Sequence, residues 1–262
     1  MKRVLLGAIT LVLACGGAKD QKTQGTADNT KTTPATSEPP KAAGGGGGVS
    51  GGGSVSGTVK FTGTAPANPK IDMSEEPACK AKYTTPPTDP VVVVHDGNLQ
   101  NVFIYVKSGL PAGGKYETPS KEVELDQEGC LYKPRVLGVM VNQNIKIKNG
   151  DPVLHNIKAV PQKNRGFNIS QPQQGMATDR AFTTEEMPVP IECNVHGWMH
   201  GKVFVMSHPF FAVSDENGSF KISGLPAGTY TIEAWHEKLG TKTATVTVTE
   251  KGEATAAFSY GG

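Results

Sequence analysis

The chain has 262 residues, with 26 basic and 24 acidic side chains and a formal net charge of +2. Without the two basic residues of the leader described next, the two signs are equal in number. We therefore expect no basic patch for nucleic acid and no net field that would steer a charged partner. The length permits one or two domains.

Residues 1–15 have the pattern of a bacterial lipoprotein signal peptide. A basic start precedes an apolar run over 4–14, which is too short to span a bilayer. The run ends at Val12-Leu13-Ala14-Cys15, which resembles a lipobox, where the leader is cut before the cysteine and the thiol receives a lipid. We expect export and a lipid anchor at Cys15 on the periplasmic side of the outer or inner membrane, and Gly16 favours the outer one. An ordinary secretory signal cut nearby is the alternative.

Residues 16–53 have the composition of a disordered tether. They are rich in Gly, Thr, Ser, Pro, Ala and Lys, contain no aromatic residue and have almost no aliphatic one. Such a segment buries too little apolar surface to offset the cost of ordering. A flexible coil of this length would separate its ends by roughly 30–40 Å, which would let the folded part reach partners above a membrane.

Strands are predicted from residue 54 onward. Short stretches rich in Val, Thr and Ile alternate between apolar and polar residues, and Gly and Pro separate them. With few long helical periodicities, this pattern predicts an all-β protein made of β-sandwiches. In chain order, the predicted strands cover residues 54–61, 91–94, 102–106, 121–125, 136–140, 144–148, 154–160, 188–192, 202–206, 231–235 and 243–248.

The most informative motif is Cys193-x-x-His196-x-x-Met199, read together with His155 upstream. It supplies one thiolate, two imidazoles and one thioether, which is the ligand set of a blue (type 1) copper site. A structural zinc site would want four strong ligands and no Met. We therefore predict one copper ion, bound strongly by Cys193, His155 and His196 and weakly by the axial Met199. Each residue alone would more often be a surface or core residue, so the prediction rests on their joint order and spacing.

Residues 121–207 resemble the cupredoxins, and most closely the amicyanin type. The shared motifs are Asp151-Pro152-Val153-Leu154-His155-Asn156 and the short Cys-x-x-His-x-x-Met loop with a Gly-Lys-Val strand after it. The resemblance implies a Greek-key β-sandwich over about 116–207 with its copper ligands on the same four residues. It also implies that Asn156 ties the two ligand loops together through a hydrogen bond. For an electron carrier we further expect electrons to leave through the solvent-facing edge of His196.

Three neighbours of the motif need separate interpretation. Glu192 stands where cupredoxins often have an aromatic residue, and strand alternation should turn it away from the metal. His200 is an additional candidate ligand, but Met199 already has the axial spacing, so we expect a surface or supporting role for His200. Trp198 would form part of an apolar docking patch if exposed and would pack the loop if buried; we expect partial exposure.

Two further cysteines, Cys79 and Cys130, are predicted to form a disulfide because an exported protein meets an oxidising environment. A free or metal-binding pair is the alternative, since the sequence does not show whether the two Cα atoms are within bridging distance.

The C-terminal part resembles the carboxypeptidase-regulatory-like family, a small transthyretin-like β-sandwich. The matching runs are Asp-x-x-Gly-x-Phe at 215–220 and Leu-Pro-Ala-Gly-Thr-Tyr at 225–230. That family opens with a segment like residues 55–59, which here lie far upstream. Our hypothesis is a discontinuous sandwich, because insertion is tolerated where the ends of a loop lie close together. It would consist of residues 54–115 and 208–262, with the cupredoxin module 116–207 inserted; two consecutive domains are the alternative.

These features together predict a membrane-anchored one-electron carrier that exchanges electrons with a redox partner such as a cytochrome or a dehydrogenase. No Ser-His-Asp arrangement or assigned pair of carboxylates is visible, so no enzymatic activity is expected. Two alternatives remain open. One is a copper-handling lipoprotein without a redox partner. The other is carbohydrate or surface binding by the sandwich, for which no row of exposed aromatic residues is apparent.

Overall fold

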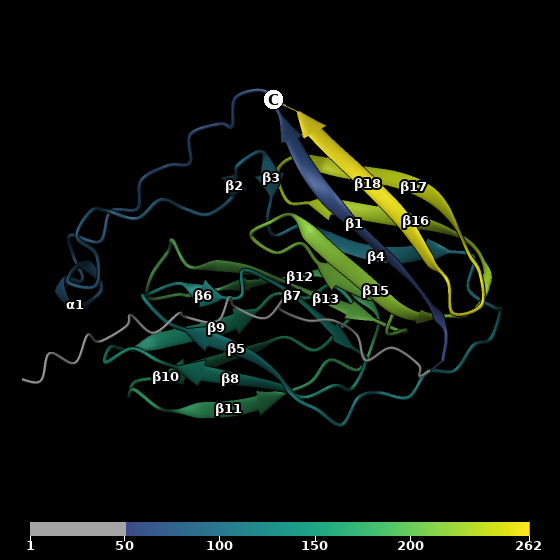
Figure 1. Ribbon diagram of the computed structural model, residues 1–262. Coiled ribbons are helices and arrows are strands. Elements are labelled where there is room, and N and C mark those ends of the chain that lie inside the picture. The colour runs from purple at the N-terminus through teal and green to yellow at the C-terminus, as the bar shows by residue number, and fades with distance from the viewer. Residues whose placement is uncertain (1–50, 262) are drawn as a thin grey trace, which may run out of the picture. The chain divides into compact units, whose positions relative to one another are not determined.

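The computed structural model describes residues 51–261 (Figure 1). Among these residues the regular structure consists of strands and one short helix, α1 (Pro77–Lys80), so the predicted all-β class is confirmed. No helix within 51–261 is long and apolar enough to cross a membrane. The predicted signal peptide, Cys15 and nearly all of the predicted tether lie outside the described residues. Gly53, the last residue of that tether, already belongs to the first strand.

Two sheets combine strands from the beginning and the end of the described chain. The first has the order β15-β1-β3-β2, with β18 also paired to β1, and the second has the order β14-β4-β16-β17. Their strands are β1 (Gly53–Thr62), β2 (Val94–His95), β3 (Asn98–Leu99), β4 (Phe103–Ser108), β14 (Phe211–Val213), β15 (Ser219–Leu225), β16 (Gly228–His236), β17 (Gly240–Val248) and β18 (Glu253–Gly261).

The pairing of β1 with β18 spans the greatest distance in sequence. The two strands run parallel, from Ser54 opposite Glu253 to Thr62 opposite Gly261. Alternation along β1 turns Val55, Val59 and Phe61 into a core that also contains buried residues of β4, β16 and β18. Residues 53–108 and 211–261 thus share both sheets. The separate domain expected over residues 116–207 stays a prediction.

Two further sheets are built from residues 123–206 alone. Their orders are β10-β9-β12-β13-β7 and β11-β8-β5-β6. In β8, for example, Ile145 and Ile147 are buried while Lys146 and Lys148 face outward, as the alternation of the sequence predicts. The strands are β5 (Val123–Gln127), β6 (Tyr132–Lys133), β7 (Val136–Met140), β8 (Ile145–Asn149), β9 (His155–Ala159), β10 (Phe167–Gln171), β11 (Ala177–Arg180), β12 (Glu186–Glu192) and β13 (His200–Met206).

Aromatic side chains join these two groups of strands. The ring of Phe103 on β4 stacks on Phe204 of β13 with centroids 3.9 Å apart, and Trp235 of β16 meets Phe204 edge-on at 4.9 Å. The absence of a side chain at Gly138 on β7 makes space for these rings, because a Cβ there would lie 2.6 Å from the ring of Phe211. The contact fixes the position of β13, the strand that follows the predicted ligand loop.

A segment with little regular structure, the strap (residues 70–88), packs on the second group of strands. A β-bridge between Lys70 and Thr88 closes it, and it carries α1. A disulfide joins Cys79 to Cys130, with Cα atoms 5.7 Å apart. The hydroxyl of Tyr83 also donates to the carbonyl of Gly129 at 2.6 Å. The strap is therefore fastened at the turn between β5 and β6.

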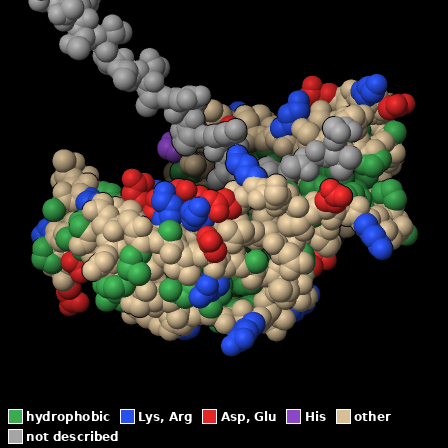
Figure 2. Space-filling view, turned by 90° about the horizontal axis from the view of Figure 1, so that it is seen from below, with side chains coloured by type: hydrophobic (Ala, Val, Ile, Leu, Met, Phe, Trp, Pro, Cys, Tyr) green, Lys and Arg blue, Asp and Glu red, His purple; other side chains and the backbone are tan. Residues whose placement is uncertain are grey.

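The surface carries charges of both signs. On the face shown in Figure 2, Lys and Arg side chains lie beside Asp and Glu side chains. Exposed ion pairs include Lys148–Glu124 and Lys221–Glu253, at 2.9 and 3.3 Å. Such exposed pairs add little stability, but their mixture of signs agrees with the near-zero net charge.

Candidate metal centre

The loop that carries the Cys-x-x-His-x-x-Met motif connects two paired strands. β12 ends at Glu192 and β13 begins at His200, and these two residues are paired with each other on the adjacent antiparallel strands. Inside the loop the Cys193 amide donates to the carbonyl of Met199 at 3.3 Å, and the Met199 amide donates to the carbonyl of His196 at 2.9 Å. The loop is thereby closed on itself, which brings its three predicted ligands onto one tight turn.

His155 reaches the same place from β9, which is hydrogen-bonded to β12. Its Nδ1 lies 3.0 Å from Nδ1 of His196, and Sγ of Cys193 lies 3.9 Å from Nδ1 of His196. The three donor atoms all lie within 4.8 Å of one another, and all three residues are buried. Two ring nitrogens and one sulfur thus converge on a single point.

The surroundings of Cys193 favour its thiolate. Burial acts to raise the pKa of this thiol, but hydrogen bonding by the His155 and His196 side chains and by backbone amides lowers the pKa to about 5. One of these amides is that of His196, 3.3 Å from the sulfur. Because the thiolate is the form that binds a metal, the site is prepared for a soft cation.

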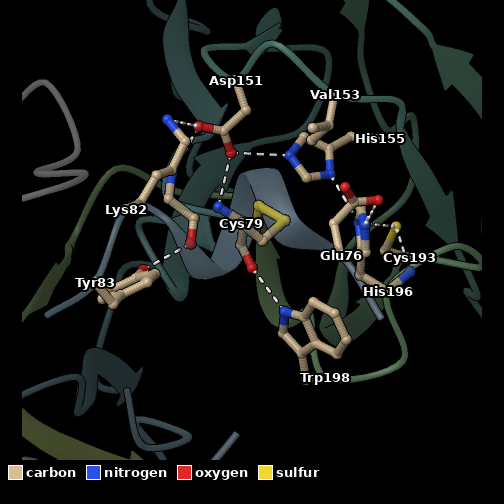
Figure 3. Close-up of a disulfide and its surroundings, with 12 residues drawn as sticks. Glu76, Cys79, Lys82, Tyr83, Asp151, Val153, His155, Cys193, His196 and Trp198 are labelled. Atoms are coloured by element: carbon tan, nitrogen blue, oxygen red, sulfur yellow. Dashed lines mark hydrogen bonds and ion pairs between the residues drawn. A yellow bond between two sulfur atoms is a disulfide. The ribbon is translucent and has the colours of Figure 1, made fainter. Parts of the chain in front are cut away.

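A buried carboxylate orients His155. Oδ2 of Asp151 lies 2.9 Å from Nε2 of His155, and Asp151 has no exposed surface (Figure 3). This contact occupies Nε2 and leaves Nδ1 free to face the point where the three donor atoms converge. Burial acts to lower the pKa of His155, the Asp151 carboxylate acts to raise it, and the net effect is a raised pKa.

Asp151 also holds the strap and the turn beside it. It accepts from the amides of Gly129 and Cys130 at 3.0 and 2.7 Å and pairs with Nζ of Lys82 at 2.7 Å. Burial acts to raise the pKa of Asp151, but its bonds with His155, Lys82 and the two amides hold that pKa far below the usual range. Asp151 belongs to the motif that ends at His155 and Asn156, but no role was predicted for it; a carboxylate four residues before a candidate ligand histidine was the available signal.

The outer edge of His196 is covered, so the expectation of a solvent-facing edge is wrong. The side chain of His196 is only 3% exposed, and its Nε2 lies 3.6 Å from Oε2 of Glu76 on the strap. Figure 3 shows Glu76 beside His196. Glu76 precedes His196 by more than a hundred residues, and no local pattern marked it as a neighbour of the motif.

Asn156 connects the two ligand-bearing segments. Its Oδ1 accepts from the amide of Asn194 at 3.2 Å, next to Cys193 in the loop. Its Nδ2 donates to Oδ1 of Asn168 at 2.6 Å, and its carbonyl accepts from the Tyr132 hydroxyl at 2.6 Å. With its side-chain amide and its carbonyl engaged, Asn156 fixes the spacing between β9 and the ligand loop.

The remaining predicted residues lie around this cluster. Met199 is fully buried in the apolar core that also contains Cys193. Trp198 is half-buried; its Nε1 donates to the carbonyl of Cys130 at 3.0 Å, and its ring centroid lies 5.0 Å from that of His196. His200 is exposed and is not part of the buried cluster. Glu192 pairs with Lys158 at 3.5 Å.

The donor set fits copper. A thiolate and two imidazoles in a buried position suit Cu better than hard cations, which prefer oxygen ligands. A second group of potential donors, Cys130 with Asp151 and His155, is not a metal site because the sulfur of Cys130 is in the disulfide.

Comparison with known proteins gives partial matches. Residues 194–257 match the family model described as polysaccharide lyase family 4, domain II, which is not the carboxypeptidase-regulatory-like family that the C-terminal motifs had suggested. No curated protein matches the chain.

Several solved structures of copper proteins resemble part of the chain. An oxidised amicyanin variant is 21% identical, with 39% of this chain and 98% of amicyanin covered and a TM-score of 0.30. The purple cupredoxin from Nitrosopumilus maritimus is 22% identical over 32% and 98% of the two chains, with a TM-score of 0.28. The copper-containing nitrite reductase from Thermus scotoductus is 20% identical with a TM-score of 0.31, and the match covers 38% of this chain and only 25% of the reductase.

Proposed function

We propose that this protein is an exported, lipid-anchored carrier of single electrons that uses one type 1 copper ion. The observation that carries the proposal is the convergence of Cys193 Sγ with Nδ1 of His155 and Nδ1 of His196 in a buried position. Met199 on the same loop would be the weak axial ligand. Bound copper would supply the Cu(I)/Cu(II) couple.

The protein's own residues support this role by holding the donors still. The ligand loop lies between paired strands, Asp151 fixes the ring of His155, and Asn156 links β9 to the loop. Donors held by such contacts move little when the charge of the metal changes. A small rearrangement favours rapid electron transfer.

We propose a carrier rather than an enzyme. Three strong ligands and an axial thioether would all come from the chain, and this leaves no open coordination position for a substrate, as a catalytic metal requires. Partner contact would use exposed apolar side chains next to the ligands. Leu154 and Val195, adjacent to His155 and His196 in sequence, are 40% and 45% exposed.

The proposed location is the periplasmic side of a membrane, with the anchor at Cys15. The lipobox supports this, and a disulfide between Cys79 and Cys130 is the chemistry expected of an oxidising compartment. The partner would be a redox protein such as a cytochrome or a dehydrogenase. The folded part would contact this partner while the tether holds it near the membrane.

A second candidate, copper storage or delivery, is favoured by one observation. The strap covers His196, which in a carrier would be a convenient edge for electron exchange. A storage protein would hold copper tightly and exchange electrons slowly.

The visible spectrum of the mature protein tests the proposal. Loading with Cu(II) is expected to give an intense thiolate-to-copper absorption that a mild reductant bleaches and an oxidant restores. The Cys193→Ser variant, once circular dichroism has shown that it is folded, should lack the band, whereas the control His200→Ala should keep it. A colourless Cu(II) complex would contradict the type 1 assignment, and very slow electron self-exchange would favour storage.

A further inference from the structure

One ring nitrogen of the candidate metal site, Nε2 of His196, lacks a hydrogen-bond partner among the described residues. His196 is 2% exposed, and its Nε2 is buried without an acceptor within hydrogen-bond distance. When Nδ1 binds a metal, Nε2 carries the ring proton, because a neutral imidazole has one N–H. A buried donor of this kind needs an acceptor, and Oε2 of Glu76, at 3.6 Å, is the carboxylate within reach.

The backbone around Glu76 is held on both sides. Its amide donates to the carbonyl of Met73 at 3.1 Å, and its carbonyl accepts from the amide of Lys80 at 3.0 Å. Three residues further on, Cys79 is joined covalently to Cys130. The carboxylate of Glu76 is therefore presented to His196 from a fixed position, although about a third of the side chain is exposed.

The contacts that hold the strap in place also reach His155, through Asp151. The Cys130 amide donates to Asp151 at 2.7 Å, and Asp151 contacts His155 at 2.9 Å. Lys82 of the strap pairs with the same carboxylate at 2.7 Å. The two histidines thus face one carboxylate each: Asp151 is local to His155, whereas Glu76 comes from a distant part of the chain.

We propose that Glu76 is a positioning residue for His196, and that the strap exists to hold this carboxylate in place and to close the outer edge of the metal site. Once Nδ1 binds copper, the Glu76 carboxylate faces the Nε2–H of His196 at 3.6 Å, and its charge keeps the ring turned so that Nδ1 points at the metal. The strap above it keeps water and foreign ligands from the edge. This inference rests on the proposed copper function.

The proposal is tested with the full mature protein loaded with copper. The variants are Glu76→Ala, which removes the acceptor, and Glu76→Gln, which keeps an acceptor oxygen but removes the charge. The matched control is Glu75→Gln, since Glu75 is the exposed neighbour in the same strap. The readouts are the rate at which bathocuproine disulfonate, a Cu(I) chelator, removes copper from the reduced protein, the reduction potential, and the NMR signal of the His196 Nε2–H in the Cu(I)-loaded protein.

Loss of a carboxylate that supports a ligating histidine weakens metal binding by about 10–100-fold. We therefore expect Glu76→Ala to speed copper removal by at least about tenfold, with a smaller acceleration in Glu76→Gln and none in the control. The potential should shift, and the Nε2–H of His196 should exchange faster with water in Glu76→Ala only. If Glu76→Ala does not fold, the removal rate and potential of Glu76→Gln decide in its place.

Two results would overturn the inference. The first is wild-type behaviour of the Glu76 variants in copper removal and potential while the wild-type protein shows its type 1 spectrum. The second is equal acceleration in the Glu75→Gln control, which would reduce the effect to general loosening of the strap. A wild-type protein without the type 1 spectrum would instead overturn the proposed function, and this inference with it.

Discussion

Oδ2 of Asp151 lies 2.9 Å from Nε2 of His155, and both side chains are fully buried. The contact determines which ring nitrogen of His155 faces Cys193 and His196. The same carboxylate binds Lys82 and two backbone amides. One side chain therefore connects a candidate metal ligand, the strap and the turn that carries Cys130.

Asp151→Ala is expected to destabilise the copper-free protein and to weaken copper binding. Removing one partner of a buried ion pair costs about 3–5 kcal/mol, and here the ring of His155 and the amide of Cys130 would stay buried without their partner. Denaturant unfolding of the copper-free protein and competition with a copper chelator measure the two effects. The control is Asp179→Asn, which changes an exposed carboxylate. A loss of stability no larger than that of the control would contradict the structural role.

The thiolate of Cys193 is expected to form near pH 5 in the copper-free protein, against an ordinary value of 9.0. Because the pKa is lower in the folded state than in the unfolded state, the thiolate stabilises the protein fully above about pH 9. This contribution is lost as the pH falls toward 5. Ultraviolet absorption of the thiolate follows the titration directly.

Two variants check that assignment. Cys193→Ser should lack the absorption step altogether, and His155→Ala should move the midpoint upward, because a hydrogen bond that lowers the pKa is removed. A midpoint close to 9 in the wild-type protein would show that the thiol is not activated in this way.

Removing the disulfide is expected to cost about 4 kcal/mol. Cys79 and Cys130 are 51 residues apart in sequence, and the bond removes the corresponding loop entropy from the unfolded chain. The double variant Cys79→Ser/Cys130→Ser avoids a new free thiol, and its unfolding in denaturant gives the difference. Adding a reductant should destabilise the wild-type protein but leave the double variant unchanged. A difference below about 1 kcal/mol would mean that hydrogen bonds alone hold the strap.

A fragment of residues 208–262 is expected not to fold by itself. Its strands β15 and β18 pair with β1, and β14 and β16 pair with β4, so the fragment alone would expose unpaired strand edges and half a core. Circular dichroism and the chemical-shift dispersion of the NMR spectrum show whether the isolated fragment is folded. A well-folded fragment would support two consecutive domains and contradict the discontinuous sandwich.

The parts of the site that could be predicted are those that lie close together in sequence. His196 and Met199 follow Cys193 at intervals of three, so their side chains share one loop, and His155 and Asn156 stand together at the start of β9. Alternation likewise predicted the buried face of β8 and of β1. The resemblance to the carboxypeptidase-regulatory-like family rested on two short runs, and the family model that matches this region is a different one.

By itself, the sequence determined the all-β class and the donor types of the candidate metal site, because alternation and loop spacing act over a few residues. Only the tertiary structure decided what surrounds those donors. The pairing of β1 with β18, the burial of the His196 edge and the contact of Glu76 with its Nε2 each join residues far apart in the chain. Such contacts depend on how whole sheets pack and on where one disulfide fastens the strap, and no local pattern of residues specifies either.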